Sequence, residues 1–173
     1  MEFNEKTVSS NSIYDGKIIK LRVDEVTLPN GMTALREVVS HSGGSAVLCE
    51  KDGKILLVKQ FRYPYKKEIL EIPAGKINKG EDPSETAIRE LEEEGGIKAE
   101  KVNLIFKVYP TPGYTDEIIY IYKAEGLMVT RQNLDKDEFL SSNWYDKEQL
   151  KTMINNGEIV DGKTLIALLS VLK

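Results

Sequence analysis

The clearest pattern in this sequence is helical and lies between two loop signals, the Asp82 cap and the pair Gly95-Gly96. Asp82 is a favourable N-cap residue, Pro83 suits the first helical position, and Gly95 and Gly96 end the segment. At about 100° per residue, one stripe of this helix is apolar and an adjacent arc is acidic. The stripe consists of Ala87, Ile88 and Leu91, and the arc consists of Glu90, Glu93 and Glu94. The pattern predicts a helix that buries one side and presents carboxylates on another.

Extended segments separated by turn signals make up most of the remaining chain. The turn signals are the pairs Asp15-Gly16, Asn30-Gly31 and Asp52-Gly53. The expected strands cover residues 12–28 with an internal turn, 35–40, 46–50, 55–60, 104–109 and 117–124. A loop over residues 110–116 separates the last two of them.

Two further helices are expected at the end of the chain. The first runs from the Asp146 cap to Gly157, and the second runs from about Asp161 to Leu172. Strands followed by helices in this order predict an α/β sandwich with a mixed central sheet.

The acidic arc is unusual because it works against the stability of its own helix. Carboxylates in the last turn oppose the helix macrodipole, and carboxylates four residues apart repel each other. One interpretation is a solvated acidic surface, which is the usual meaning of a charge run. The other is a divalent cation among Glu90, Glu93 and Glu94, which turns both costs into attraction. Oxygen ligands with no nearby cysteine or histidine pair favour Mg²⁺ or Mn²⁺ over zinc.

Composition limits the class of protein. With 173 residues and a formal net charge of −4, the chain suits one domain with a substantial core and is not a basic nucleic-acid-binding chain. Cys49 is the only cysteine, which excludes an intrachain disulfide and favours a reducing compartment. The first ten residues do not resemble a secretory signal, and the apolar stretch 165–172 is too short to cross a bilayer. We therefore expect one cytoplasmic domain over residues 1–173 with no membrane partner.

The segment 75–97 resembles the Nudix box, G-x5-E-x7-R-E-U-x-E-E-x-G-U with U a bulky aliphatic residue, at every fixed position. The resemblance implies an α/β/α sandwich in which the box forms a loop, a helix and a loop. It also implies hydrolysis of a nucleoside diphosphate linked to another group, with two or three Mg²⁺ or Mn²⁺ ions per site. By resemblance, the metal ligands are the carbonyl of Ala74 and the side chains of Glu90, Glu93 and Glu94, and Glu93 is alternatively the group that activates water. Glu81 and Arg89 are implied to pair and hold the loop against the helix.

Segments outside the box resemble the bacterial ADP-ribose pyrophosphatase branch of the family. They are REVVSHSGGSAVL at 36–48, QFRYP at 60–64, EIPAGKI at 71–77 and TPGYTDE at 111–117. The resemblance implies cleavage of ADP-ribose to AMP and ribose 5-phosphate. Another nucleoside diphosphate sugar, such as GDP-mannose, is the alternative substrate. A Nudix-fold sensor that binds its ligand without cleaving it is the alternative class of protein, and the intact box favours the enzyme.

The same branch exchanges its early strands between the subunits of a dimer. The resemblance therefore implies a homodimer to which an N-terminal antiparallel strand region, residues 1–42, contributes. Arg36 and Glu37 in this region are candidates for substrate contacts in the partner's site.

Three further residues are candidates for substrate contacts. Arg62 is a candidate for a phosphate or ribose contact, because a guanidinium forms bidentate bonds with such oxygens. Its alternative is a solvated residue at a strand edge. Tyr114 is a candidate for stacking on the base, and Glu117 for orienting the substrate.

The general base is expected on the acidic loop 133–139, which reads NLDKDEF. Glu138 is the candidate, as metal ligand or base, with Asp137 behind it. The alternative is a loop that is polar only because it is solvated. Ser141 stands where relatives tend to have a further acid.

Overall fold

The computed structural model describes residues 3–136 and 138–172. Contacts between Cα atoms divide the chain into two compact units. The first unit comprises Met1–Gly43 and Tyr109–Ile118, and the second comprises Gly44–Val108 and Ile119–Lys173. The single domain over residues 1–173 stays a prediction.

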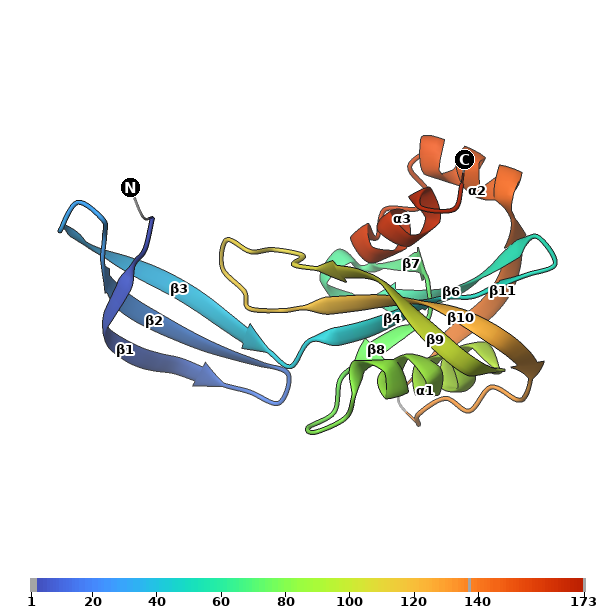
Figure 1. The fold of residues 1–173 in the computed structure, drawn as a ribbon, viewed down its shortest axis with the longest axis horizontal. Coiled ribbons are helices and arrows are strands. Elements are labelled where there is room, and N and C mark those ends of the chain that lie inside the picture. The colour runs from blue at the N-terminus through green and yellow to red at the C-terminus, as the bar shows by residue number, and fades with distance from the viewer. Residues whose placement is uncertain (1–2, 137, 173) are drawn as a thin grey trace. The chain divides into compact units, whose positions relative to one another are not determined.

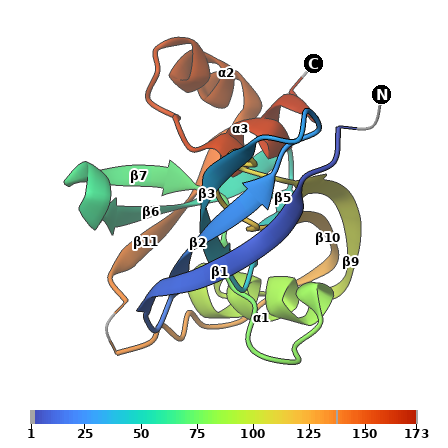
Figure 2. The ribbon, with the colours of Figure 1, turned by 90° about the vertical axis from the view of Figure 1, so that its left-hand side faces the viewer.

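The first unit is a three-stranded antiparallel sheet with one attached loop. Its strands are β1 (Lys6–Asp15), β2 (Ile19–Thr27) and β3 (Thr33–His41), in the order β1-β2-β3 (Figure 2). The loop 109–118 lies against β3, because Val39 N donates to Tyr114 O at 2.7 Å and Val39 O accepts from Asp116 N at 3.2 Å. The predicted N-terminal antiparallel region is present, and its first strand begins six residues before Ser12.

The second unit contains two sheets. The first has the order β8 (Ala74–Lys76), β4 (Gly44–Leu48), β10 (Ile119–Val129) and β9 (Ile97–Val108), with β4 and β10 parallel and the other pairs antiparallel. The second has the order β11 (Leu140–Asp146), β6 (Lys54–Arg62) and β5 (Glu50–Lys51), and β7 (Lys67–Glu71) also pairs with β6. A 3-10 turn over Tyr63–Tyr65 joins β6 to β7.

Helices cover both sides of these sheets. The helix α1 (Pro83–Gly95) lies on one side, and α2 (Lys147–Asn155) and α3 (Gly162–Leu169) lie on the other (Figure 1). Successive side chains of a strand point to opposite faces, so buried strands need apolar residues at every position. One core cluster joins Ala46, Leu48, Ile55 and Leu57 to α2 and α3, and the other joins Val47, Cys49 and Leu56 to α1. The predicted α/β/α sandwich with a mixed sheet is confirmed.

The helix α1 begins and ends where the sequence predicts. The Asp82 carboxylate accepts a hydrogen bond from Ser84 N at 2.8 Å, and Gly96 adopts a left-handed conformation with φ of 63°. Ala87 and Leu91 are fully buried. Ile88, which was predicted on the same stripe, is partly exposed and lines a surface pocket. Among the described helices, none is long and apolar enough to cross a membrane.

Candidate active site

Glu90 and Glu94 lie on the side of α1 that faces β8. Their relative exposures are 7% and 2%. Glu94 Oε2 accepts a hydrogen bond from Ala74 N at 2.9 Å. A Cβ atom at Gly75 would lie 1.8 Å from Glu90 Oε1, so the carboxylate occupies the space that any side chain there would take. The first glycine of the box therefore allows α1 and β8 to bring Ala74, Glu90 and Glu94 together.

The electrostatics of this pair favour a bound cation. Burial raises the pKa of Glu94 to about 8, and the charges of Glu90 and Glu138 act in the same direction against the opposing Ala74 N–H and Arg62. Burial also raises the pKa of Glu90, although Arg89 opposes that rise. Carboxylates with raised pKa values are ionised more readily when positive charge is placed beside them. The oxygen donors and the cost of burying them both fit a divalent cation.

Arg89 links the loop of the box to its helix. Its Nε and Nη2 atoms donate to the two carboxylate oxygens of Glu81, at 2.9 and 3.2 Å, which confirms the predicted pair. Its Nη1 atom donates to Glu90 Oε1 at 2.7 Å and to Glu93 Oε2 at 2.8 Å. In the described part of the chain, no group of three acidic, histidine or cysteine side chains gathers closely enough to hold an ion. The carboxylates of the acidic arc therefore have different partners, because Glu93 pairs with Arg89 and Glu94 accepts from Ala74 N on β8.

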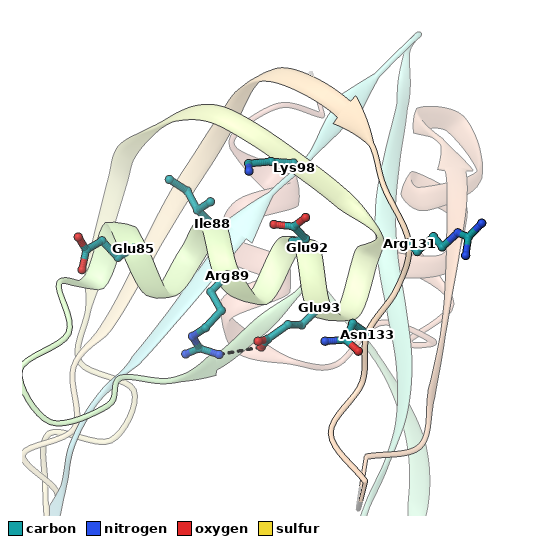
Figure 3. A pocket seen from close by; sticks show the side chains of 8 residues that line it. All are labelled: Glu85, Ile88, Arg89, Glu92, Glu93, Lys98, Arg131 and Asn133. Carbon is teal, nitrogen blue, oxygen red and sulfur yellow. Dashed lines mark hydrogen bonds and ion pairs between the residues drawn. The ribbon is translucent and has the colours of Figure 1, made fainter.

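A surface pocket of about 460 Å³ runs along α1 (Figure 3). It is lined by Glu85, Ile88, Arg89, Glu92, Glu93, Lys98, Arg131 and Asn133. Figure 3 shows Glu93 turned toward Arg89 and joined to it by a dashed line. Glu92, which points away from the Glu90 side of the helix, is half-buried and lines this pocket. The pocket therefore reaches Glu93, a candidate catalytic residue.

The segment after β10 is fixed to the C-terminal end of α1. The bonds run from Thr130 N to Gly96 O at 2.7 Å, from Gln132 Nε2 to Glu94 O at 2.7 Å, and from Asn133 N to Glu93 O at 3.0 Å. The last carbonyls of a helix have no partner within the helix, so these donors satisfy them. Sequence reasoning missed Gln132, because a single glutamine in a loop belongs to no pattern.

Glu138 follows this fixed segment and belongs to the same electrostatic site. Its charge contributes to the raised pKa of both Glu90 and Glu94. The side chain is half-buried, and its Oε2 atom accepts from Asp135 N at 3.3 Å. Asp137 lies outside the described residues. The structure therefore brings the predicted Glu138 to the carboxylates of α1, and its role as ligand or base stays a prediction.

Arg62 ends β6 and lies near the same carboxylates. Its charge opposes the raised pKa of Glu94. The side chain is 39% exposed and forms an ion pair with the buried Glu71. Sequence reasoning named Arg62 but neither Glu71 nor its second partner, Lys163.

The other four candidates for substrate contact belong to the first compact unit. Arg36 Nη2 pairs with Glu5 Oε1 at 2.6 Å, and Glu37 is exposed. Glu117 Oε1 lies 3.3 Å from His41 Nδ1, and Tyr114 is 55% exposed. Their roles in substrate binding stay predictions.

Comparisons with known proteins agree with this geometry. The NUDIX domain model matches residues 39–167, and the model of the nucleoside diphosphate sugar hydrolase N-terminal domain matches residues 5–39. A crystal structure of an ADP compounds hydrolase superposes with a TM-score of 0.86 over 99% of this chain and 94% of its own. Its sequence is 18% identical, so this likeness concerns the fold.

Two curated relatives are similar over nearly the whole chain. An ADP-ribose pyrophosphatase of Bacillus subtilis (strain 168) is 46% identical, covering 95% of this chain and 90% of the relative. A methanol dehydrogenase activator of Bacillus methanolicus is 44% identical, covering 95% of this chain and 91% of the relative. Members of the NUDIX family generally depend on divalent metal, which the buried carboxylates of α1 suit. The resemblance predicted from the box is confirmed, and this chain belongs to the NUDIX domain family.

Proposed function

We propose that this chain hydrolyses the pyrophosphate of ADP-ribose to AMP and ribose 5-phosphate. The observation that carries the proposal is the buried pair Glu90 and Glu94, whose pKa values burial raises, with Glu94 bonded to Ala74 N and Glu90 packed against Gly75. A site of this kind concentrates negative charge where cations and the phosphates they bind are held. The choice of ADP-ribose is supported by the relative at 46% identity, which is named an ADP-ribose pyrophosphatase.

In this reaction a water oxygen bonds to one phosphorus, the bridging P–O bond breaks, and one proton is released. Two or three Mg²⁺ or Mn²⁺ ions, when bound, would supply positive charge for the phosphate oxygens and would make a nearby water more acidic. The groups that would hold them are the Ala74 carbonyl and the carboxylates of Glu90, Glu93, Glu94 and Glu138. Glu138 accepts the proton of the water, with Glu93 as the alternative base. Arg62 binds a phosphate oxygen.

Three alternatives share this fold. GDP-mannose or another nucleoside diphosphate sugar is the second candidate substrate. A sensor without catalysis, or an activator of another enzyme as in the relative at 44% identity, is the other class. The identities of the two relatives do not separate hydrolysis from activation, and turnover of ADP-ribose by the purified protein does. The buried Glu90 and Glu94 support hydrolysis because carboxylates that suit a cation provide for the metal that pyrophosphate cleavage needs.

A substrate panel tests the proposal. The purified protein is assayed with Mg²⁺ against ADP-ribose, GDP-mannose, NADH, diadenosine polyphosphates and deoxynucleoside triphosphates, and the products are identified. We expect AMP and ribose 5-phosphate from ADP-ribose at the highest kcat/KM, and no turnover in excess EDTA. A higher kcat/KM for GDP-mannose would make GDP-mannose the substrate in place of ADP-ribose. Tight binding of ADP-ribose without turnover of any compound would overturn the enzyme assignment.

We also propose that the chain is a homodimer to which residues 1–42 contribute. All ten residues of β1 are exposed, and among the described residues of the first unit only Val26 is a buried apolar residue. The exposed large apolar residues within residues 1–42 are Phe3, Val8, Ile13, Tyr14, Ile18, Ile19, Met32 and Leu35. A small sheet with so little buried apolar surface needs another surface to cover it. In this arrangement Arg36 and Glu37 serve the partner's substrate site, with Glu117 and Tyr114 as further contacts.

Light scattering at micromolar protein concentration measures the molecular mass and so tests the homodimer. We expect twice the 19.5 kDa mass of one chain. Leu35→Lys replaces an apolar residue that is 67% exposed with a charged one. This substitution should shift the population from the dimer toward the single chain. A wild-type protein of one-chain mass contradicts the homodimer.

The cytoplasm is the location that we propose, with neither nucleic acid nor a membrane as partner. Cys49 is the only cysteine of the sequence, so no intrachain disulfide can form, which fits a compartment in which cysteines stay reduced. The net charge of −4 gives no basic excess for binding nucleic acid.

A further inference from the structure

Arg62 is oriented by a carboxylate that the reaction above does not use. Its Nε atom donates to Glu71 Oε1 at 2.5 Å, and its Nη2 atom donates to Glu71 Oε2 at 2.6 Å. The Glu71 side chain is 3% exposed. Two parallel bonds fix the plane of a guanidinium, so Glu71 sets the orientation of Arg62. Across the described residues, Nη1 of Arg62 donates to no protein acceptor, which leaves this edge for an oxygen of a ligand.

A second cation shares the same carboxylate. Lys163 Nζ, from α3, lies 2.5 Å from Glu71 Oε2 and 3.0 Å from Asp161 Oδ2, and its side chain is 11% exposed. Asp161 is also the N-cap of α3 and accepts hydrogen bonds from the N and Oγ1 atoms of Thr164. Thr164 Oγ1 in turn accepts from Ile72 N at 2.9 Å. Two independent contacts thus tie the start of α3 to the segment that carries Glu71.

Lys163 changes the net charge around Arg62. Burial acts to raise the pKa of Glu71, but the hydrogen bond from Arg62 and the charge of Lys163 hold it below its ordinary value. Glu71 is therefore ionised at neutral pH and, with Arg62 as its sole partner, would cancel the charge of the guanidinium. One carboxylate shared by two cations leaves the three residues with a net positive charge. With Asp161, which pairs with Lys163 at 3.0 Å, the four groups sum to zero, whereas without Lys163 they would carry one net negative charge beside Arg62.

We propose that Glu71 and Lys163 are positioning residues for Arg62 in pyrophosphate binding. Glu71 holds the guanidinium so that Nη1 faces the phosphates, and Lys163 offsets the charge of Glu71 so that Arg62 stays an effective anion-binding group. Neither residue touches the substrate. The inference rests on the proposed function for the identity of the anion. Because Arg62 binds the phosphates before and during the reaction, the effect belongs mainly to KM.

Steady-state kinetics with ADP-ribose and Mg²⁺ test the role of Lys163. Lys163→Met keeps the length of the side chain and removes its charge, and Lys163→Arg restores the charge. We expect Lys163→Met to raise KM about tenfold with kcat within about threefold of wild type, and Lys163→Arg to stay within about threefold for both. A purely structural role would lower kcat through loss of folded protein and leave KM unchanged, and that result would overturn the proposal.

A double-mutant cycle shows whether the effect passes through Arg62. In an Arg62→Ala background, Lys163→Met should change KM by less than about twofold, because the group that it supports is gone. If the tenfold effect of Lys163→Met persists without Arg62, the proposed coupling is wrong. The cycle uses no substitution of Glu71, so it still tests the coupling of Lys163 to Arg62 if the variant Glu71→Gln does not fold.

The orientation of Arg62 can be measured without substrate. The Nε–H signal of Arg62 in a proton–nitrogen NMR spectrum is assigned by its loss in Arg62→Ala. We expect slow exchange with solvent in the wild type, fast exchange in Glu71→Gln, and no change in Glu68→Gln, which alters an exposed carboxylate on the same strand. A signal that Glu71→Gln leaves unchanged overturns the positioning. If the wild type instead shows this signal but leaves ADP-ribose intact, the proposed function fails while the orientation stands.

Discussion

Replacement of Glu94 by glutamine is expected to lower the rate of ADP-ribose hydrolysis by about 1000-fold, a loss of several kcal/mol of metal-dependent stabilisation. Glu94 is 2% exposed and accepts from Ala74 N at 2.9 Å. Glutamine keeps the volume and an oxygen for that bond, but it removes the negative charge that would hold a cation. The measurement is kcat at saturating ADP-ribose over a wide range of Mg²⁺ concentrations. Glu92→Gln, two residues away on the same helix, changes a half-buried carboxylate that lines the surface pocket. It is the matched control and should stay close to wild type.

The same substitution should stabilise the protein when metal is removed. Burial raises the pKa of Glu94 from 4.5 to about 8, so the folded wild type loses stability as the pH rises through this window. Glutamine does not ionise, and its advantage therefore grows up to about pH 8 and then stays constant. At about pH 8.5 in EDTA we expect Tm to rise by about 4 °C or more. Wild-type activity at all metal concentrations, or a lower Tm, would contradict the role of Glu94 as a buried ligand.

The helix of the box could be predicted because its signals are local. The Asp82 cap and the glycines at its end lie within the segment itself, and α1 spans Pro83–Gly95 as expected. The predicted apolar stripe was too wide, because of its three residues only Ala87 and Leu91 belong to the core cluster beneath the helix. Ile88 stands at the edge of the stripe, where a single residue's angle does not decide between core and pocket.

Several strands were missed because tertiary pairing forms them. The strands β7 and β8 are short, and the segment KKEILEIPAGK around them combines charges with a proline and a glycine, so no alternation marks them. The strand β9 begins at Ile97, seven residues before the predicted start at Leu104. Its first half is held by an antiparallel ladder with β10 that reaches Val129. Such a ladder depends on a partner strand elsewhere in the chain, and the local propensity of a segment carries no information about that partner.

The candidate site shows the same division between local and distant contacts. The carboxylates of α1 and the Glu81–Arg89 pair lie within the box and were predicted from it. The contact between Glu71 and Lys163 joins residues 92 positions apart, and each looks like an ordinary surface charge in the sequence. Only the fold shows that Glu71 is buried and that the mostly buried Lys163 forms an ion pair with it.

Gly75→Ala is expected to lower kcat/KM for ADP-ribose by about 100-fold while leaving the fold intact. The new Cβ atom would lie 1.8 Å from Glu90 Oε1 and 2.1 Å from its Cδ, so the carboxylate must move. The displaced atoms are the far end of a flexible side chain, and the backbone of Gly75 does not require a positive φ. The protein should therefore fold with nearly unchanged Tm, and the loss falls on the metal ligand. Thermal unfolding and kinetics on the same samples measure both effects.

Gly44→Ala is the matched control for this prediction, because Gly44 lies on the neighbouring strand opposite Lys76 and its new Cβ would meet no atom closer than 3.5 Å. It should keep near-wild-type activity. A second test uses Glu90→Asp, which withdraws the carboxylate by one methylene. If the clash with Glu90 is the cause, Gly75→Ala should lower activity much less in the Glu90→Asp background than in the wild type. Equal losses in both backgrounds would mean that Gly75 acts through another contact, since removing the clashing atoms should remove the effect.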